Sequence, residues 1–101
     1  MFTNGMRPVH PGEILREEYL EPLDMSANAL ATALHLTATR VNEIVRERRG
    51  VTPDTALRLS RYFGTTPEFW LNLQMTYDLR KAAQEEWGHI VEEIEPLEMA
   101  A

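Results

Sequence analysis

The sequence predicts an all-α fold of five helices around one small core. Apolar residues recur at helical spacing in five stretches. These stretches carry helix start or stop signals, such as a capping hydroxyl, a first-turn proline or a terminal glycine. A chain of 101 residues, of which 44% are hydrophobic, has the length of a single domain and enough apolar side chains for one modest core.

The first ten residues are interpreted as an N-terminal arm (1–10), and the first helix begins after it. Pro8 and Pro11 disfavour a helix before Pro11. A proline in the first turn and Glu13 near the positive end of the helix dipole favour a helix after that point. Pro22 ends this helix. Its predicted core residues are Ile14, Leu15, Tyr19 and Leu20.

Residues 26–46 are the centre of the chain, because two short helical patterns lie on either side of a tight break at His35. Ser26 and Thr37 can each cap one helix, since a hydroxyl can accept a backbone amide of the first turn. Small Ala31 lets the two helices approach closely, and His35 is expected in the left-handed conformation at some steric cost. This pattern predicts a helix-turn-helix, whose second helix can lie in a DNA major groove.

Another helix is predicted directly after this motif. Gly50 is expected to close the second motif helix. The cap and first-turn proline at Thr52–Pro53 start the next helix, which runs to about Phe63 and stops at Gly64. Its predicted inward residues are Ala56, Leu57, Leu59, Ser60 and Phe63, and its predicted outward residues are Arg58 and Arg61.

A fifth helix begins at Thr66–Pro67 with the same start signal and is apolar on more than one face. One face suffices to cover the core, so the remaining apolar surface needs another partner. We therefore expect a DNA-binding and dimerisation domain over residues 11–81. Residues 82–101 form an acidic C-terminal segment. A short amphipathic helix is predicted there, with apolar residues Trp87, Ile90, Val91 and Ile94.

The charge of the chain is unevenly distributed. The formal net charge is −6, which by itself argues against a nucleic-acid partner. Residues 37–61, however, hold six arginines against three acids, a net charge of +3, and the rest of the chain carries −9. A basic patch on an acidic body orients a protein on phosphates and makes its binding sensitive to salt.

The exposed face of the second motif helix supplies the candidate DNA contacts. Arginine can bond bidentately to guanine and asparagine to adenine, and a hydroxyl or a helix N-terminus can bind phosphate. Because the N-terminal end of such a helix enters the groove, Thr39 and Arg40 are the expected base contacts. Glu43 either contacts DNA or orients Arg40 or Arg46. The predicted DNA-binding set is Thr37, Thr39, Arg40, Asn42, Glu43, Arg46, Arg48 and Arg49, the last three as backbone clamps. The alternative is an ordinary solvated helix face.

The sequence predicts no catalytic, cofactor or metal site. The chain has no cysteine, its three histidines are dispersed, and adjacent glutamates such as Glu92 and Glu93 point to different sides of a helix. It also lacks a glycine-rich phosphate loop, so we expect a protein that is not an enzyme and needs no cofactor. No apolar run approaches about 18 residues, which argues against a membrane span. The absence of cysteine fits a cytoplasmic location.

Three segments carry a family resemblance: RPVHPGEILREEYLEPL (7–23), NALATAL, and RVNEIVRERRGVTPDTALRLSRYFGTTPEFWLNLQ (40–74), which is followed by YDL. With these segments the chain resembles the HigA family of antitoxins, within the Xre/Cro-like helix-turn-helix group, over roughly residues 7–80. The resemblance implies a lambda-repressor-like fold and a dimer that represses transcription from its own promoter by binding a palindromic operator. It also implies a partner resembling a HigB toxin, a ribosome-dependent messenger-RNA endonuclease.

Two departures from the family pattern affect the expected operator contacts. Many Xre-type motifs have glutamine near the start of the first motif helix, where this chain has Ala27, and the usual turn glycine is His35 here.

A two-fold dimer would place its recognition helices about 34 Å apart. We expect the fifth helix to form the dimer seam, with core packing as the alternative, most readily for Phe69 and Trp70. The predicted seam residues are Trp70, Leu73 and Tyr77.

Acidic residues are the candidate surface for a basic toxin, because an RNA-cleaving protein needs a positive groove. Glu17 and Glu18 are the predicted toxin-binding residues, with general solubility as the alternative explanation of their charge. Two other functions stay open at this point. One is a stand-alone Xre-type repressor without a toxin, and the other is a protein-interaction module whose helix-turn-helix no longer touches DNA.

Overall fold

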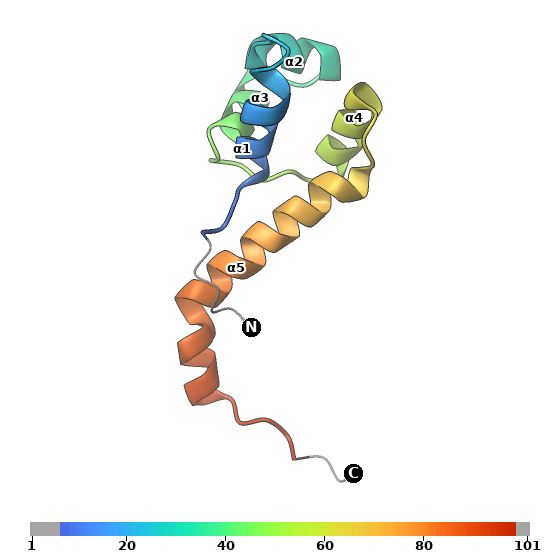
Figure 1. Cartoon of the computed structure of the whole chain (residues 1–101). Coiled ribbons are helices and arrows are strands. Elements are labelled where there is room, and N and C mark those ends of the chain that lie inside the picture. The colour runs from blue at the N-terminus through green and yellow to red at the C-terminus, as the bar shows by residue number, and fades with distance from the viewer. Residues whose placement is uncertain (1–6, 99–101) are drawn as a thin grey trace.

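The computed structural model describes residues 7–98, which are helical and contain no strand (Figure 1). The elements, in order, are α1 (Pro11–Ile14), η1 (Leu15–Leu20), α2 (Ala27–Leu34), α3 (Ala38–Val45), α4 (Pro53–Phe63) and α5 (Pro67–Glu93). Here η1 is a short π-helix that continues α1 directly, so the two together are the first predicted helix. The all-α, five-helix prediction is confirmed. Most of the predicted N-terminal arm, residues 1–6, lies outside the described residues.

The predicted helix starts are confirmed by hydroxyl caps. The side-chain oxygen of Ser26 accepts the Ala29 amide at 3.0 Å and that of Thr66 accepts the Phe69 amide at 3.1 Å. The predicted left-handed residue at His35 is also confirmed, with φ 57°, as is the Gly64 stop, with φ 75°. These local signals depend on only a few neighbouring residues, which is why they can be recognised in the sequence.

The predicted end of the third helix at Gly50 is wrong. The helix ends at Val45, and Glu47 takes the left-handed conformation with φ 64°. The amide of Arg48 then bonds the Glu43 carbonyl at 2.8 Å, which closes the helix in the manner of a Schellman turn. A left-handed residue with a Cβ costs about 1–2 kcal/mol, so packing elsewhere must hold Glu47 in place.

Trp70 is the centre of the core. Its side chain is 0% exposed, and its indole Nε1 donates a hydrogen bond to the Thr65 hydroxyl at 2.8 Å. Tyr19 and Phe63 place their rings 5.2 and 6.4 Å from that of Trp70. The other fully buried apolar side chains around it include Leu15, Leu30, Val41, Ile44 and Leu59. Every helix therefore contributes to a single core.

Two predicted details are wrong: the orientation of Leu57 and the extent of the last helix. Leu57, predicted to face inward, is 59% exposed, because α4 presents Thr55, Ala56 and Leu59 to the core instead. The separate short helix predicted near Trp87 is the end of α5, which runs without interruption for 27 residues. In Figure 1 the second half of α5 extends away from the other helices.

Residues His10–Gly12 start α1 and pack it against two other helices. The imidazole Nδ1 of His10 accepts the Gly12 amide at 2.8 Å and so caps α1, and Pro11 occupies the first turn. The His10 ring also packs edge-on against Tyr77 of α5, with 4.8 Å between centroids. Gly12 lies against the backbone of α3, where a Cβ would come within 1.8 Å of the Ile44 carbonyl oxygen. This region of α1 thus holds α3 and α5 together.

Gly12→Ala is predicted to destabilise the domain by about 3 kcal/mol or more, because the added methyl overlaps a backbone atom that cannot rotate away. Chemical denaturation measures the change. Gly88→Ala in α5 is the matched control, since no neighbour lies within 4 Å of the new methyl group there. We expect that variant to be neutral or more stable by up to about 1 kcal/mol. Equal stability of the two variants would contradict the close approach at Gly12.

Acidification from pH 7.5 to 5.5 is predicted to destabilise the protein through His10. Burial lowers the pKa of His10, outweighing the opposite influence of Glu47 and Asp78. The unfolded chain therefore binds a proton near pH 6.5 that the folded chain binds only at lower pH, so stability falls as the pH drops through this range. Urea denaturation at several pH values measures it. His10→Asn retains a capping acceptor without titrating, so its stability should depend less on pH over the same range.

Candidate nucleic-acid interface

Helices α2 and α3 form the predicted helix-turn-helix. The turn between them closes α2 through two hydrogen bonds, from the His35 amide to the Thr32 carbonyl at 3.2 Å and from the Leu36 amide to the Ala31 carbonyl at 3.0 Å. Helix α3 then buries Val41 and Ile44 and leaves a polar face outward. A shallow hollow on this face lies between α2, α3 and the loop after α3. Its lining residues are Asn28, Ala38, Thr39, Asn42, Glu43, Arg46 and Arg48.

The N-terminal end of α3 is exposed to solvent and is capped by a threonine hydroxyl. Thr37 accepts the Arg40 amide at 3.2 Å, and both Thr37 and Thr39 are exposed. Backbone amides at a helix start carry partial positive charge, which attracts phosphate. Thr37 and Thr39 are therefore accessible at the start of α3, and their contacts with DNA stay a prediction.

Asn42 is bonded to a residue that the sequence analysis missed. Its Nδ2 donates to the Asn28 Oδ1 and to the Ala38 carbonyl, both at 2.8 Å. Within residues 7–98 the Asn42 Oδ1 and the Asn28 Nδ2 form no hydrogen bond, and Asn28 is exposed while Asn42 is half-buried. Asn28 lies one position after Ala27, where the family pattern has its glutamine. Only the packing of α2 on α3 brings the two amides together, so spacing along the chain could not have identified Asn28.

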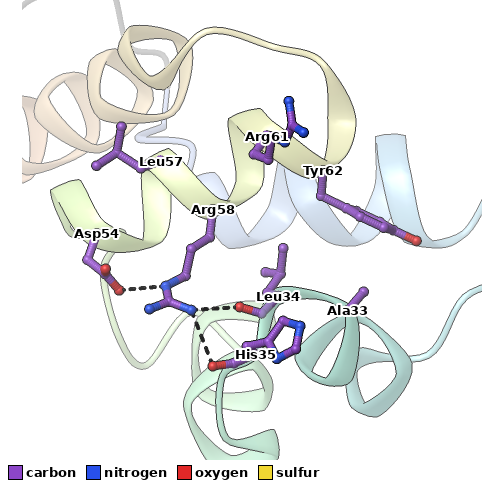
Figure 2. Close-up of a pocket in the computed structure, with 8 residues that line it drawn as sticks. All are labelled: Ala33, Leu34, His35, Asp54, Leu57, Arg58, Arg61 and Tyr62. Atoms are coloured by element: carbon purple, nitrogen blue, oxygen red, sulfur yellow. Dashed lines mark hydrogen bonds and ion pairs between the residues drawn. The ribbon is translucent and has the colours of Figure 1, made fainter.

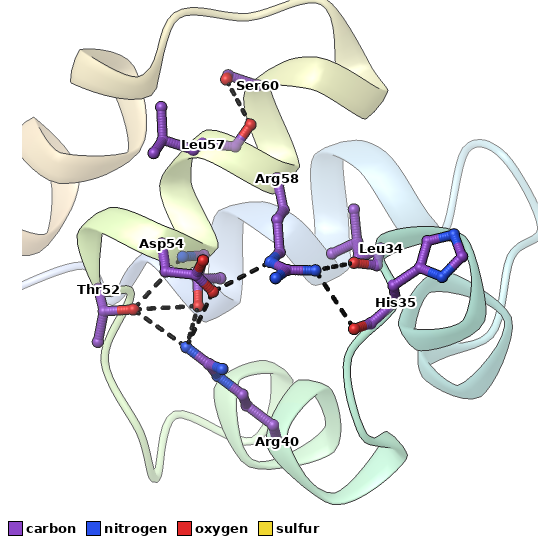
Figure 3. Close-up of polar contacts among 9 residues, drawn as sticks. Leu34, His35, Arg40, Thr52, Asp54, Leu57, Arg58 and Ser60 are labelled. Atoms are coloured by element: carbon purple, nitrogen blue, oxygen red, sulfur yellow. Dashed lines mark hydrogen bonds and ion pairs between the residues drawn. The ribbon is translucent and has the colours of Figure 1, made fainter.

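Arg40 does not project outward as predicted. Figure 3 shows its guanidinium turned toward the start of α4. Its Nη2 donates to the hydroxyls of Thr52 and Thr55 at 3.2 and 3.0 Å and lies 3.6 Å from a carboxylate oxygen of Asp54. In this protomer three acceptors at the start of α4 hold the side chain, so Arg40 acts as a brace between α3 and α4. That Arg40 reads a base stays a prediction, and it requires the side chain to leave these partners.

Arg58 makes a second brace, between α4 and the end of α2 (Figures 2 and 3). Its Nη1 donates to the carbonyls of Leu34 and His35 at 2.9 and 3.3 Å, and its Nε donates to Asp54 at 3.0 Å. A cation at a helix C-terminus satisfies unpaired carbonyls and opposes the negative end of the dipole. Arg58 was predicted to face outward, but its polar group is used within the protomer.

The end of α3 is held by Arg16 of η1. Its Nη1 donates to the Val45 carbonyl, and its Nη2 lies 3.3 Å from the Glu47 carboxylate. Arg16 therefore satisfies the C-terminus of α3 and holds the left-handed residue Glu47. Sequence analysis did not single out Arg16, because 29 residues separate it from Val45.

The remaining arginines divide into paired and unpaired groups. Arg49 forms an ion pair with Glu43 at 2.9 Å, so Glu43 orients Arg49 rather than Arg40 or Arg46. Among residues 7–98, no side-chain hydrogen bond or ion pair involves Arg46, Arg48 or Arg61. Two of these three, Arg46 and Arg48, line the hollow on the α3 face. They are the positive charges available to an external anion there.

The predicted seam residues lie on the inward side of α5. Trp70 is fully buried in its own protomer, so the prediction that it contacts a second copy is wrong. Leu73 packs against the core and Tyr77 against His10, and both are only partly exposed. The opposite face of the same helix carries the exposed apolar side chains, including Met75 and Leu79 at 60% and 53% exposure.

Glu17 and Glu18 are exposed on η1, and Glu17 lies 3.3 Å from Arg16.

In the part of the chain that the structure describes, no group of three acidic, histidine or cysteine residues could hold a metal ion. Among the helices of residues 7–98, none has both the length and the hydropathy of a membrane span.

Arg40→Ala is predicted to lower the free energy of unfolding by about 1 kcal/mol, because it removes two hydrogen bonds and a weak ion pair that are partly exposed. Thermal or urea denaturation measures the loss. Arg48→Ala is the control, since that side chain is unpaired within residues 7–98, and its stability should stay within about 0.5 kcal/mol of wild type. An unchanged stability of Arg40→Ala would show that the brace contributes nothing.

Comparisons with known proteins agree with this geometry. The helix-turn-helix family model matches residues 17–70. The chain is 62% identical over 82 residues to virulence-associated protein I of Dichelobacter nodosus, covering 81% of this chain and 76% of that protein. The solved structure of antitoxin GraA is 55% identical with a TM-score of 0.90, covering 92% of this chain and all of that one.

A second solved structure shows a relative together with DNA. The Pseudomonas aeruginosa antitoxin HigA with higBA promoter is 53% identical to this chain, with a TM-score of 0.89, covering 91% of this chain and all of that one. The chain therefore belongs to the HigA family of antitoxins, within the Xre-like helix-turn-helix group.

Proposed function

We propose that this chain is a cytoplasmic, homodimeric antitoxin without catalytic activity. It binds and neutralises a HigB-like messenger-RNA endonuclease and represses its own operon by binding a palindromic operator. The observation that carries the DNA part is the exposed face of α3, where an open helix N-terminus and two unpaired arginines lie around one hollow. The relative of known structure with its promoter supports the same assignment.

The contacts to DNA divide into base reading and phosphate binding. Thr39 and Asn42 of α3, with Asn28 of α2, line the hollow beside α3, where base edges would be read. Thr37, with the helix N-terminus, would bind phosphate. Arg46 and Arg48 would bind phosphate from the end of α3 and the loop after it. Arg49 would do so after leaving its ion pair with Glu43. Arg40 supports this surface from behind, through α4.

The dimer seam is proposed on the outward face of α5. Leu71, Met75 and Leu79 follow one another at helical spacing, and they line a shallow hollow together with Gln74 and Asp78. An exposed apolar stripe of this kind marks a protein interface. A symmetric pair would place the same stripe of each copy against the other and present two α3 helices to the two halves of a palindrome.

Toxin binding is proposed from the family relationship and from the acidic surfaces. Glu17 and Glu18 offer one exposed acidic surface on η1, as the sequence predicted. A basic RNA-binding toxin would be attracted to such a surface. The two rival functions predict different behaviour: a stand-alone repressor binds DNA but no toxin, and an interaction module binds no operator.

Co-expression tests the proposal most directly. The small open reading frame next to this gene is expressed in a host with and without this chain, which carries an affinity tag. The proposal expects growth arrest without the chain, rescue with it and co-purification of the two proteins. A harmless neighbour, or one that does not bind, would reduce the function to repression. The absence of salt-dependent binding to the upstream DNA would contradict repression.

Met75→Glu with Leu79→Glu is predicted to weaken dimerisation at least tenfold, because it buries two carboxylates in the proposed seam. Sedimentation at several concentrations measures the dimer, and operator affinity should fall with it. Gln84→Glu is the control, since Gln84 is exposed on α5, lies on the side of the helix away from the stripe and does not line the hollow. An unchanged dimer in the double variant would place the seam elsewhere.

A further inference from the structure

Gln74 connects the outward stripe of α5 to the loop that follows α3. Its Oε1 accepts the Val51 amide at 2.7 Å, and its Nε2 donates to Asp78 Oδ1 at 2.9 Å. Gln74 and Asp78 also line the hollow beside Leu71, Met75 and Leu79. One side-chain amide is thus bonded to the loop on one side and to the proposed dimer surface on the other.

Gly50 allows this close contact. A Cβ at position 50 would lie 2.9 Å from the Cδ and Oε1 atoms of Gln74, closer than side-chain atoms normally pack. The next residue, Val51, is buried and forms part of the core. The sequence predicted that Gly50 ends α3, and this is wrong. Its small size instead lets the loop pass directly against Gln74.

The loop of residues 46–50 is therefore held at two points. At its start, Arg16 bonds the Val45 carbonyl and pairs with Glu47. At its end, Gln74 bonds the Val51 amide. Between these anchors, residues 46–49 are exposed and carry three arginines. Only a fixed loop can present arginines to phosphates without a large loss of conformational entropy on binding.

We propose that Gln74 is a positioning residue for DNA binding, which holds the arginine loop in place from the helix that carries the dimer stripe. The inference rests on the proposed operator binding and goes beyond it, because Gln74 is no DNA contact itself. Pairing of α5 with a second copy would further restrict Asp78 and Gln74 and so hold the loop more firmly before DNA arrives. Ordering of a shared element by one partner favours binding of the other.

The test measures operator affinity against salt concentration for Gln74→Leu, with duplex DNA from the region upstream of this gene. The slope of log K against log salt reports the number of phosphate contacts, about 0.9 for each. We expect Gln74→Leu to reduce the slope by about 1 to 2 per protomer and to reduce affinity about tenfold at moderate salt. Gln84→Leu, the same exchange at an exposed position in the second half of α5, should leave the slope unchanged.

Two further variants separate positioning from a general loss of structure. Arg46→Ala with Arg48→Ala should reduce the slope similarly, and adding Gln74→Leu to that pair should cause no further fall. The exchange Gln74→Glu with Asp78→Asn keeps the acceptor for Val51 and the donor–acceptor pair within α5, so it should restore most of the slope. Hydrogen exchange of the Val51 amide should be faster only in the variants that carry Gln74→Leu.

The possible outcomes separate this inference from the proposed function. An unchanged slope in Gln74→Leu, or a fall that simply adds to that of the arginine variants, would overturn the inference while leaving operator binding intact. A monomeric Gln74→Leu at the concentrations used would overturn it as well, since loss of the dimer would then explain the effect. Wild-type protein that does not bind the upstream DNA would overturn both.

Discussion

The domain depends on one constraint: arginines from other helices must bond the ends of its short helices. Helices α2 and α3 have only eight residues each, which is too short for either to be stable alone in water. Arg58 bonds the last carbonyls of α2, and Arg16 bonds the last carbonyl of α3. Both are cations at the negative end of a helix dipole, and both come from another helix. The angle of the recognition helix therefore depends on tertiary contacts.

The same bonds determine which positive charges remain available to DNA. Six arginines lie in residues 37–61, but Arg40, Arg49 and Arg58 pair with acids of the same region. The unpaired ones are Arg46, Arg48 and Arg61, as far as residues 7–98 are described. Arg40 and Arg58 share Asp54, and Glu47 pairs with Arg16 outside the region, so these three side chains are the arginines of the region that no acid neutralises. Local charge counts predict the sign of the surface, but the pairing decides its shape.

Helix α5 serves two surfaces at once. One face places Trp70 in the core and Tyr77 against His10, and the other exposes Met75 and Leu79. Gln74 lies where these faces meet and bonds the end of the arginine loop. A single helix therefore joins the core, the stripe proposed for dimerisation and the loop proposed to bind phosphate. The buried His10 and the close approach of Gly12 to α3 complete this arrangement from the first helix.

The sequence by itself determined the all-α class, the helix starts at Ser26, Thr37, Thr52 and Thr66, the left-handed turn and the family. These features depend on residues a few positions apart, so local patterns suffice to predict them. Only the tertiary structure decided that Arg40 faces α4, that Asn28 bonds Asn42, and that Trp70 belongs to the core rather than the seam. Such contacts join residues far apart in the chain, and periodicity cannot say which of two apolar faces of a helix is covered.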